Sequence, residues 1–150
     1  MSLIVLLDAG PLGMITNPKS SPENEACKNW LANLAYSGVE IAIPEIADYE
    51  VRRELLRAGK ERGLRRLDAL RGIFRYAPIT TPVMHQAAEF WAAARKIGRQ
   101  SADDASLDAD MILAAQAGAL VRAGDETVIA TTNVRHLTLF ASARVWREIG

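Results

Sequence analysis

Residues 3–8 read LIVLLD, an unbroken apolar run that ends at an aspartate. Runs of this kind are typical of central strands in a parallel sheet, which are buried on both faces. Residues 127–133, TVIATTN, repeat the pattern, and Asn133 follows the strand-like part after one further residue. Sites in such sheets form just beyond the carboxyl ends of the strands. Each of these two strands is therefore expected to place a ligand-type residue, Asp8 or Asn133, at the edge of the sheet.

The rest of the chain alternates between helical and strand-like patterns. Apolar spacing, glycine stops and prolines predict helices over 23–37, 45–58, 61–74, 82–97 and 107–121. Shorter strands are expected over 39–43, 76–79 and 144–146, and loops over 11–22 and 99–106. Alternation of this kind predicts an α/β fold, a three-layer α/β/α sandwich around a mostly parallel sheet, with residues 1–150 as one domain.

The charge of the chain is balanced overall but uneven along its length. There are 18 basic and 18 acidic residues, which argues against a nucleic-acid binder that relies on bulk positive charge. Residues 1–51, however, hold seven acids and two bases, whereas residues 52–75 hold nine bases and three acids. The composition, 49% hydrophobic and 24% charged, is that of a globular protein and excludes disorder, collagen and coiled coil.

Compartment signals are few and consistent. Cys27 is the only cysteine, so no internal disulfide can form. The N-terminal apolar run is short and lacks a preceding basic region, unlike a signal peptide. No apolar run approaches the roughly 18 residues that span a bilayer. We predict a cytoplasmic protein that does not bind membranes.

Two predicted helices add carboxylates. Glu50 lies in the helix over 45–58, and Asp108 and Asp110 lie in the first turn of the helix over 107–121. Taken singly, Glu50 has an ordinary explanation as a surface partner of Arg53, and the two aspartates as residues that stabilise a helix N-terminus. Taken together, converging carboxylates repel one another unless a hard cation such as Mg²⁺, which prefers oxygen ligands, neutralises them. No cysteine or histidine cluster suggests zinc.

In their order along the chain, these segments resemble the PIN domain, and within it the VapC-like ribonucleases of toxin–antitoxin pairs. The segments are LIVLLDAG with Asp8, IPEIADYEVRREL with Glu50, DADMILAAQA with Asp110 and ATTNVRHL with Asn133. The resemblance implies an endoribonuclease that depends on Mg²⁺ or Mn²⁺. It further implies a homodimer and inhibition by a small antitoxin protein.

The resemblance also implies the roles of the site residues. Asp8, Glu50 and Asp110 would hold the cation, and Asp108 and Asn133 would assist or orient water. Two choices stay open, because Glu45 competes with Glu50 and Asp108 competes with Asp110. Asp103 and Asp104 precede the helix and are further candidates, while His136 stands where the family often has another acid.

Phosphate binding is expected from the basic block and its surroundings. We predict that Arg52, Arg53, Arg57 and Arg135 bind the RNA backbone. The block has two other interpretations, a solvated helix face or a docking surface for an acidic segment of a partner. Aromatic residues are few, so base stacking is not expected to dominate affinity.

Three other functions were compared with this one. A Toprim-type site fits poorly, because the strand-end acid is Asp and the DAD segment begins a helix. A receiver-type domain needs an acid pair after its first strand and a late lysine, neither of which is present. A catalytically inactive PIN scaffold that binds RNA or protein stays an alternative.

Overall fold

The computed structural model describes residues 2–97 and 104–150, and within them five parallel strands form one sheet in the order β3-β2-β1-β4-β5. The strands are β1 (Leu3–Leu7), β2 (Glu40–Pro44), β3 (Arg75–Ala77), β4 (Glu126–Thr131) and β5 (Ala143–Val145). The central strand is β1, the first apolar run of the sequence, and it pairs with β4 from Leu3↔Glu126 to Leu7↔Ala130. The two strands with the clearest sequence patterns therefore lie side by side.

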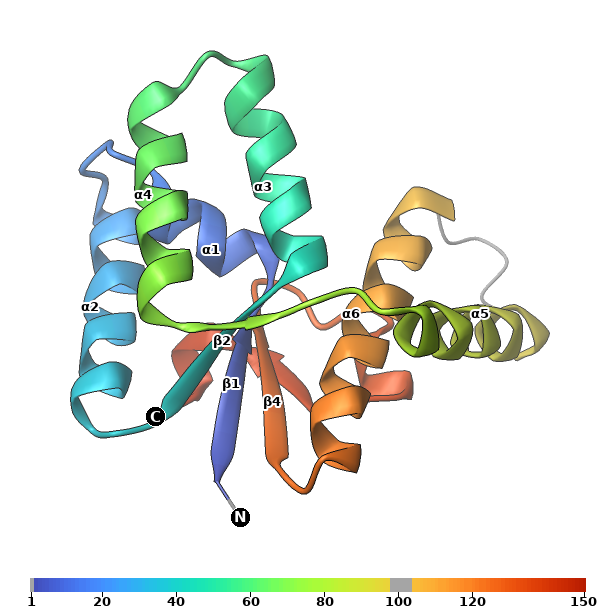
Figure 1. The fold of residues 1–150 in the computed structure, drawn as a ribbon. Helices are drawn as coiled ribbons and strands as arrows, with labels where there is room; N and C mark the ends of the chain where they lie inside the picture. The colour runs from blue at the N-terminus through green and yellow to red at the C-terminus, as the bar shows by residue number, and fades with distance from the viewer. Residues whose placement is uncertain (1, 98–103) are drawn as a thin grey trace.

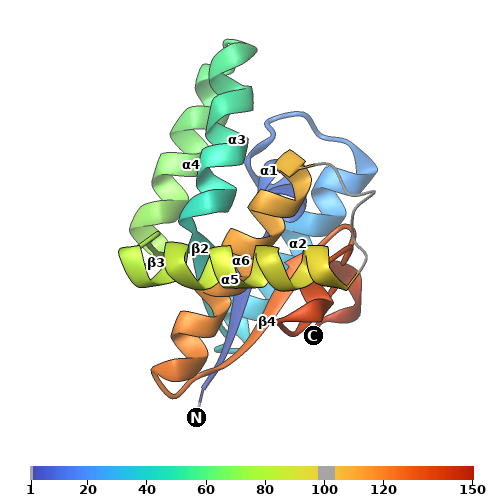
Figure 2. The ribbon, with the colours of Figure 1, turned by 90° about the vertical axis from the view of Figure 1, so that its right-hand side faces the viewer.

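Helices cover both faces of the sheet, so the predicted three-layer α/β/α sandwich is confirmed (Figure 1). Side chains of β1 alternate between two cores, with Val5 and Leu7 in one and Ile4 and Leu6 in the other. The first face carries α1 (Ala9–Thr16), α2 (Pro22–Tyr36), α3 (Glu45–Arg57) and α4 (Glu61–Ile73). The second carries α5 (Thr81–Lys96) and α6 (Asp104–Arg122), and Figure 2 shows α5 lying across α6. Short 3₁₀ helices, Leu137–Leu139 and Trp146–Glu148, flank β5.

The loop predicted over 11–22 is wrong in its first half, because α1 extends to Thr16. The side chain of Asp8 caps this helix by accepting a hydrogen bond from the backbone N–H of Ala9 at 2.7 Å. Pro11 lies in the first turn, where a missing N–H leaves no helical bond unmade. Leu12 and Ile15 pack into the first core, so burial stabilises a segment whose glycines and proline predicted a loop.

The α3–α4 pair projects beyond the carboxyl ends of the strands (Figure 1). One arginine joins the two helices. Arg52 Nε lies 2.9 Å from Asp48 Oδ1 on α3, and Arg52 Nη2 lies 2.8 Å from Asp68 Oδ1 on α4.

The loop predicted over 99–106 ends earlier than expected, since α6 begins at Asp104. Residues 98–103 of that loop lie outside the described part of the chain. Within the described ranges, no helix combines the length and apolar character that a bilayer crossing requires.

Candidate active site

A small polar cavity lies at the carboxyl ends of the two central strands, β1 and β4. Its volume is about 180 Å³ and it is lined by Asp8, Ala9, Gly10, Glu50, Thr131, Thr132, Asn133 and Arg135. Four of the residues singled out in the sequence therefore meet here, although they come from β1, α3 and the loop after β4. This is the position that a parallel sheet favours for a site.

Asp8 lines this cavity, and both of its carboxylate oxygens are hydrogen-bonded. Its side chain is buried, with one oxygen bonded to the backbone N–H of Ala9 and the other accepting from the Thr131 hydroxyl at 2.8 Å. Thr131 also accepts a hydrogen bond from the backbone N–H of Asn133 at 3.2 Å. Thr131 was not among the predicted site residues. The signal for it was the Thr-x-Asn spacing within the segment that supplied Asn133.

Asp110 is not among the residues that line the cavity, but it contacts Arg135, which does line it. Its side chain is about 2% exposed, and its Oδ1 accepts a hydrogen bond from Arg135 Nη2 at 2.7 Å. The other oxygen, Oδ2, is buried and has no hydrogen-bond partner among the residues that the structure describes. Burial raises the pKa of the Asp110 carboxyl, and the Arg135 guanidinium opposes that rise. The sequence placed Asp110 at the rim of the core but gave no reason to pair it with Arg135.

Glu50, not Glu45, is the glutamate that faces the cavity. Burial raises the pKa of Glu50, and the neighbouring Asp8 raises it further, while Arg53 at 4.0 Å lowers it. Glu45 turns elsewhere, because its Oε1 accepts a hydrogen bond from the backbone N–H of Ile79 at 2.7 Å. Asp110 also contributes to the raised pKa of Glu50. The carboxylates of Asp8 and Asp110 therefore lie close enough to Glu50 to disfavour its charged form.

Asp108 lies away from these carboxylates. It is exposed and lines a different groove of about 350 Å³ between α5 and α6, with apolar neighbours that include Met84, Trp91 and Met111. Side chains two positions apart in a helix point about 200° away from each other, so Asp108 and Asp110 cannot share a face. Asp103 and the side chain of Asp104 lie outside the described part of the chain.

The predicted RNA-binding arginines have different surroundings. Arg52 is paired with Asp48 and Asp68. Arg53 lies over the ring of Tyr49, with its guanidinium carbon 5.1 Å from the ring centroid. Arg57 is 74% exposed in its side chain and pairs with Glu54 at 2.8 Å. Arg53 and Arg57 keep an exposed face, whereas Arg52 acts mainly as a link between helices.

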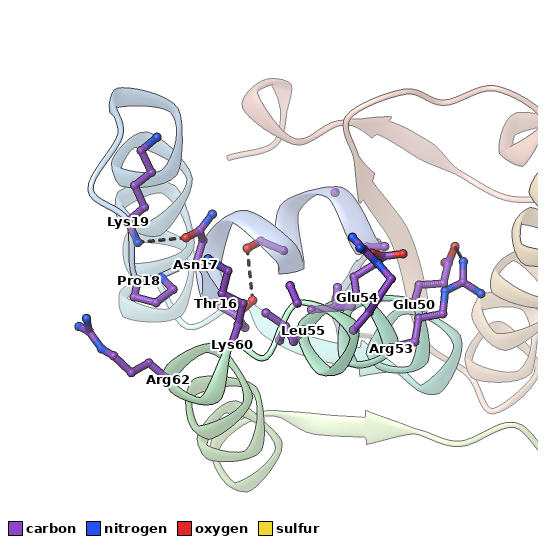
Figure 3. A pocket seen from close by; sticks show the side chains of 16 residues that line it. Thr16, Asn17, Pro18, Lys19, Glu50, Arg53, Glu54, Leu55, Lys60 and Arg62 are labelled. Carbon is purple, nitrogen blue, oxygen red and sulfur yellow. Dashed lines mark hydrogen bonds and ion pairs between the residues drawn. The ribbon is translucent and has the colours of Figure 1, made fainter.

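A larger groove of about 840 Å³ adjoins the cavity and shares Ala9, Gly10 and Glu50 with it. In Figure 3, Glu50 and Arg53 lie at one end, and Lys19 and Arg62 lie at the other. The charged residues that line it are Lys19, Glu50, Arg53, Glu54, Arg57, Lys60 and Arg62. The excess of cations suits an anionic occupant. Lys19 was missed in the sequence, because it lies far from the basic block and joins it only through the fold.

The site has the donor atoms for a hard cation but not a finished cage. Within residues 2–97 and 104–150, no group of three or more His, Cys, Asp or Glu side chains is arranged for a metal ion. Arg135 takes up one oxygen of Asp110, while Oδ2 of the same carboxylate has no donor. An oxygen-only set with one unsatisfied buried acceptor fits Mg²⁺ or Mn²⁺, because Mg²⁺ keeps several waters and needs few protein ligands.

Comparison with known proteins identifies the family and the fold. The PIN domain model matches residues 5–140. No curated protein sequence matches the chain. The structure of VapBC2 from Rickettsia felis, bound to a promoter DNA fragment, has a TM-score of 0.73 at 17% identity and covers 95% of this chain and 98% of that one. VapBC-1 from nontypeable Haemophilus influenzae has a TM-score of 0.67 at 14% identity and covers 96% of this chain and 98% of that one.

Mycobacterium tuberculosis VapC20, described as a toxin that cleaves the sarcin-ricin loop, has a TM-score of 0.62 at 13% identity and covers 90% of this chain and 94% of that one. At such identities these likenesses establish the fold.

Proposed function

Because this chain belongs to the PIN domain family, we propose that it is a divalent-metal-dependent endoribonuclease and the toxin component of a VapBC-type pair. The observation that carries the proposal is the meeting of three carboxylates at one small polar cavity: Asp8 and Glu50 line it, and Asp110 is hydrogen-bonded to Arg135, which also lines it. Grouped carboxylates repel one another and so destabilise a fold, which is why their grouping favours a catalytic role. The likeness to a toxin described as cleaving RNA at the sarcin-ricin loop supports the same class of substrate.

The proposed cation is Mg²⁺ or Mn²⁺, held by Asp8, Glu50 and Asp110 directly or through water. When bound, it supplies positive charge that acidifies a water and balances the charge that develops on a phosphodiester. Asn133, which lines the cavity, assists by orienting water. Asp108 has no part in this proposal, because it faces the α5–α6 groove.

The protein groups supply orientation and proton transfer. Thr131 and the Ala9 amide fix both oxygens of Asp8, so that carboxylate presents one geometry. Glu50 lines the cavity beside Asp8, where its carboxylate is placed to accept a proton from a water. Arg53, Arg57 and Arg135 contact RNA phosphates, while Arg52 is left out because Asp48 and Asp68 already pair with it.

The partner in this proposal is a small antitoxin protein that covers the basic groove beside the cavity. The groove shares Glu50 with the cavity, so a protein lying in it would block RNA from the carboxylates. Two solved structures of similar fold, described as VapBC complexes, support such a partner. The homodimer and the cytoplasmic location stay predictions, and sedimentation equilibrium of the purified chain tests the first.

The decisive test compares Asp8→Asn with Asp108→Asn in a cleavage assay on ribosomal and transfer RNA, with Mg²⁺, Mn²⁺ or EDTA. We expect the cleavage rate of D8N to fall by about a hundredfold or more, since the change removes a charged ligand. The matched change D108N should leave the rate unchanged, because that acid lies elsewhere. Cleavage by D8N at the wild-type rate would refute the proposal. Wild-type protein that binds RNA without cleaving it would favour the inactive scaffold.

A further inference from the structure

Arg135 holds an unusual position in the site. Its φ of 38° is the one positive value among the described non-glycine residues, a conformation that side chains disfavour. Two contacts hold it there. The Asn133 side-chain oxygen accepts from the Arg135 backbone N–H at 3.1 Å, and the guanidinium donates to Asp110 at 2.7 Å. In this conformation of the loop after β4, the Arg135 guanidinium lies against Asp110.

This contact places the positively charged Arg135 guanidinium beside the buried Asp110 carboxylate. Asp110 is buried, its Oδ2 has no donor, and Asp8 adds to the repulsion on it. Arg135 also lines the cavity and keeps a side chain that is 39% exposed, so the guanidinium has room to leave. Asp110 is fixed in a helix, whereas Arg135 is on a loop between β4 and a 3₁₀ helix. Of the two partners, Arg135 is the one that can move.

We infer that Arg135 is a positioning residue that competes with the divalent cation for Asp110. Without a cation, it neutralises Asp110 and keeps the acidic cluster folded. With a cation bound, Asp110 turns its charge to the cation and the guanidinium is released into the cavity, where a phosphate can take it up. It is consistent with the finding that, among the described residues, no group of three acids is arranged for a metal ion while Arg135 is in place. The inference rests on the proposed function, since it assumes that the cluster binds a cation.

The first test measures Mn²⁺ affinity by calorimetry for the wild type, Arg135→Gln and Arg144→Gln, without RNA. We expect R135Q to bind Mn²⁺ about tenfold more tightly, the factor expected when a charge-assisted hydrogen bond no longer competes. Arg144 is exposed on β5 and does not line the cavity, so R144Q removes equal charge and should bind as the wild type does. If R135Q does not fold, Arg135→Lys replaces it, with a smaller gain because lysine lacks the planar fork.

The second readout follows the guanidinium itself by NMR. The Arg135 Nε–H signal, assigned by its absence in R135Q, should shift as Mg²⁺ saturates the wild type. Equal or weaker Mn²⁺ binding by R135Q, or an unmoved Arg135 signal in Mg²⁺-saturated protein, overturns this inference and leaves the nuclease proposal standing. Absence of Mn²⁺ binding in the wild type and in R135Q alike overturns both.

Discussion

At the scale of single residues, the geometry of Asp8 depends on one hydroxyl. Thr131 donates to Asp8 Oδ2 and accepts from the Asn133 amide, so it links the ends of β1 and β4. Thr131→Val keeps the shape but leaves a buried carboxylate oxygen without its donor. We expect RNA cleavage to slow by about tenfold, the effect of losing roughly one hydrogen bond of about 1.4 kcal/mol. Single-turnover cleavage rates measure the effect.

Thr131→Ser is the matched control, because it restores the hydroxyl and loses only the methyl group. Its cleavage rate should lie close to that of the wild type. Equal rates for T131V and the wild type would show that Asp8 needs no such support. Equally slow T131V and T131S would assign the effect to packing instead.

At this scale, the sequence predicts the location of polar residues along the fold better than it predicts their contacts. Asp8 and Asn133 could be placed because each follows a strand, and the structure puts both at one cavity. The choice between Glu45 and Glu50 could not be made, because both lie on one helix and only the position of Ile79 separates them. The pair formed by Asp110 and Arg135 was equally hidden, since their elements are brought together only by the sheet.

At the scale of elements, α1 must pack closely against the end of β4. A Cβ on Gly10 would lie 2.7 Å from Thr132 Cγ2 and 2.8 Å from its Oγ1, closer than such contacts occur. Gly10→Ala should therefore displace the segment that carries Thr132 and Asn133. We expect cleavage to fall by about tenfold or more, since small displacements of catalytic groups are costly. Thermal unfolding and cleavage measured together check this.

Gly13 in the same helix is the matched control. A Cβ there meets no atom within 4 Å, so Gly13→Ala should raise stability by about 0.5–1 kcal/mol, because alanine favours helices. Cleavage by G13A should stay at the wild-type level. Full activity in G10A would mean that the β4 loop adjusts without harm to the site.

The elements themselves were largely predictable, and the exceptions have physical causes. Alternation of apolar runs and helical patterns gave the sheet and most helices, because burial on two faces leaves a strong imprint on β1 and β4. α1 was missed because Gly10, Pro11 and Gly13 favour loops, whereas its stability comes from the Asp8 cap and from burial of its apolar side. Neither cause is local to the residues that form the helix.

At the scale of the whole molecule, the net charge is zero, and the basic residues have two different roles: some link elements and others line the groove. Some bases of the 52–75 block link elements, as Arg52 joins α3 to α4 and Arg75 lies 3.1 Å from Glu40 on the neighbouring strand. Others, such as Arg57 and Arg62, line the groove beside the cavity. Bases that link elements are less available for phosphate than those in the groove, so the count of bases in the sequence overstates the electrostatic attraction for RNA.

A crossed pair of variants separates the two groups. Arg52→Gln leaves the buried Asp48 without its partner, so we expect the free energy of unfolding to fall by about 2 kcal/mol. Arg57→Gln breaks only an exposed pair and should change stability by less than about 0.5 kcal/mol. For binding to single-stranded RNA the order reverses. R57Q should reduce the slope of log affinity against log salt by about 0.7, the value for one lost phosphate contact, while R52Q should leave it unchanged.

These slopes are measured on the Asp8→Asn protein, so that RNA stays intact, and unfolding is followed by urea titration. The opposite order of the two variants in stability and in salt slope is the decisive result, because a general loss of positive charge would lower the slope in both variants alike. An unchanged slope in R57Q would remove the groove from the RNA path and favour its use by a protein partner alone. A reduced slope in R52Q would mean that its guanidinium leaves Asp48 and Asp68 for phosphate. RNA would then compete with Asp48 and Asp68 for the Arg52 guanidinium.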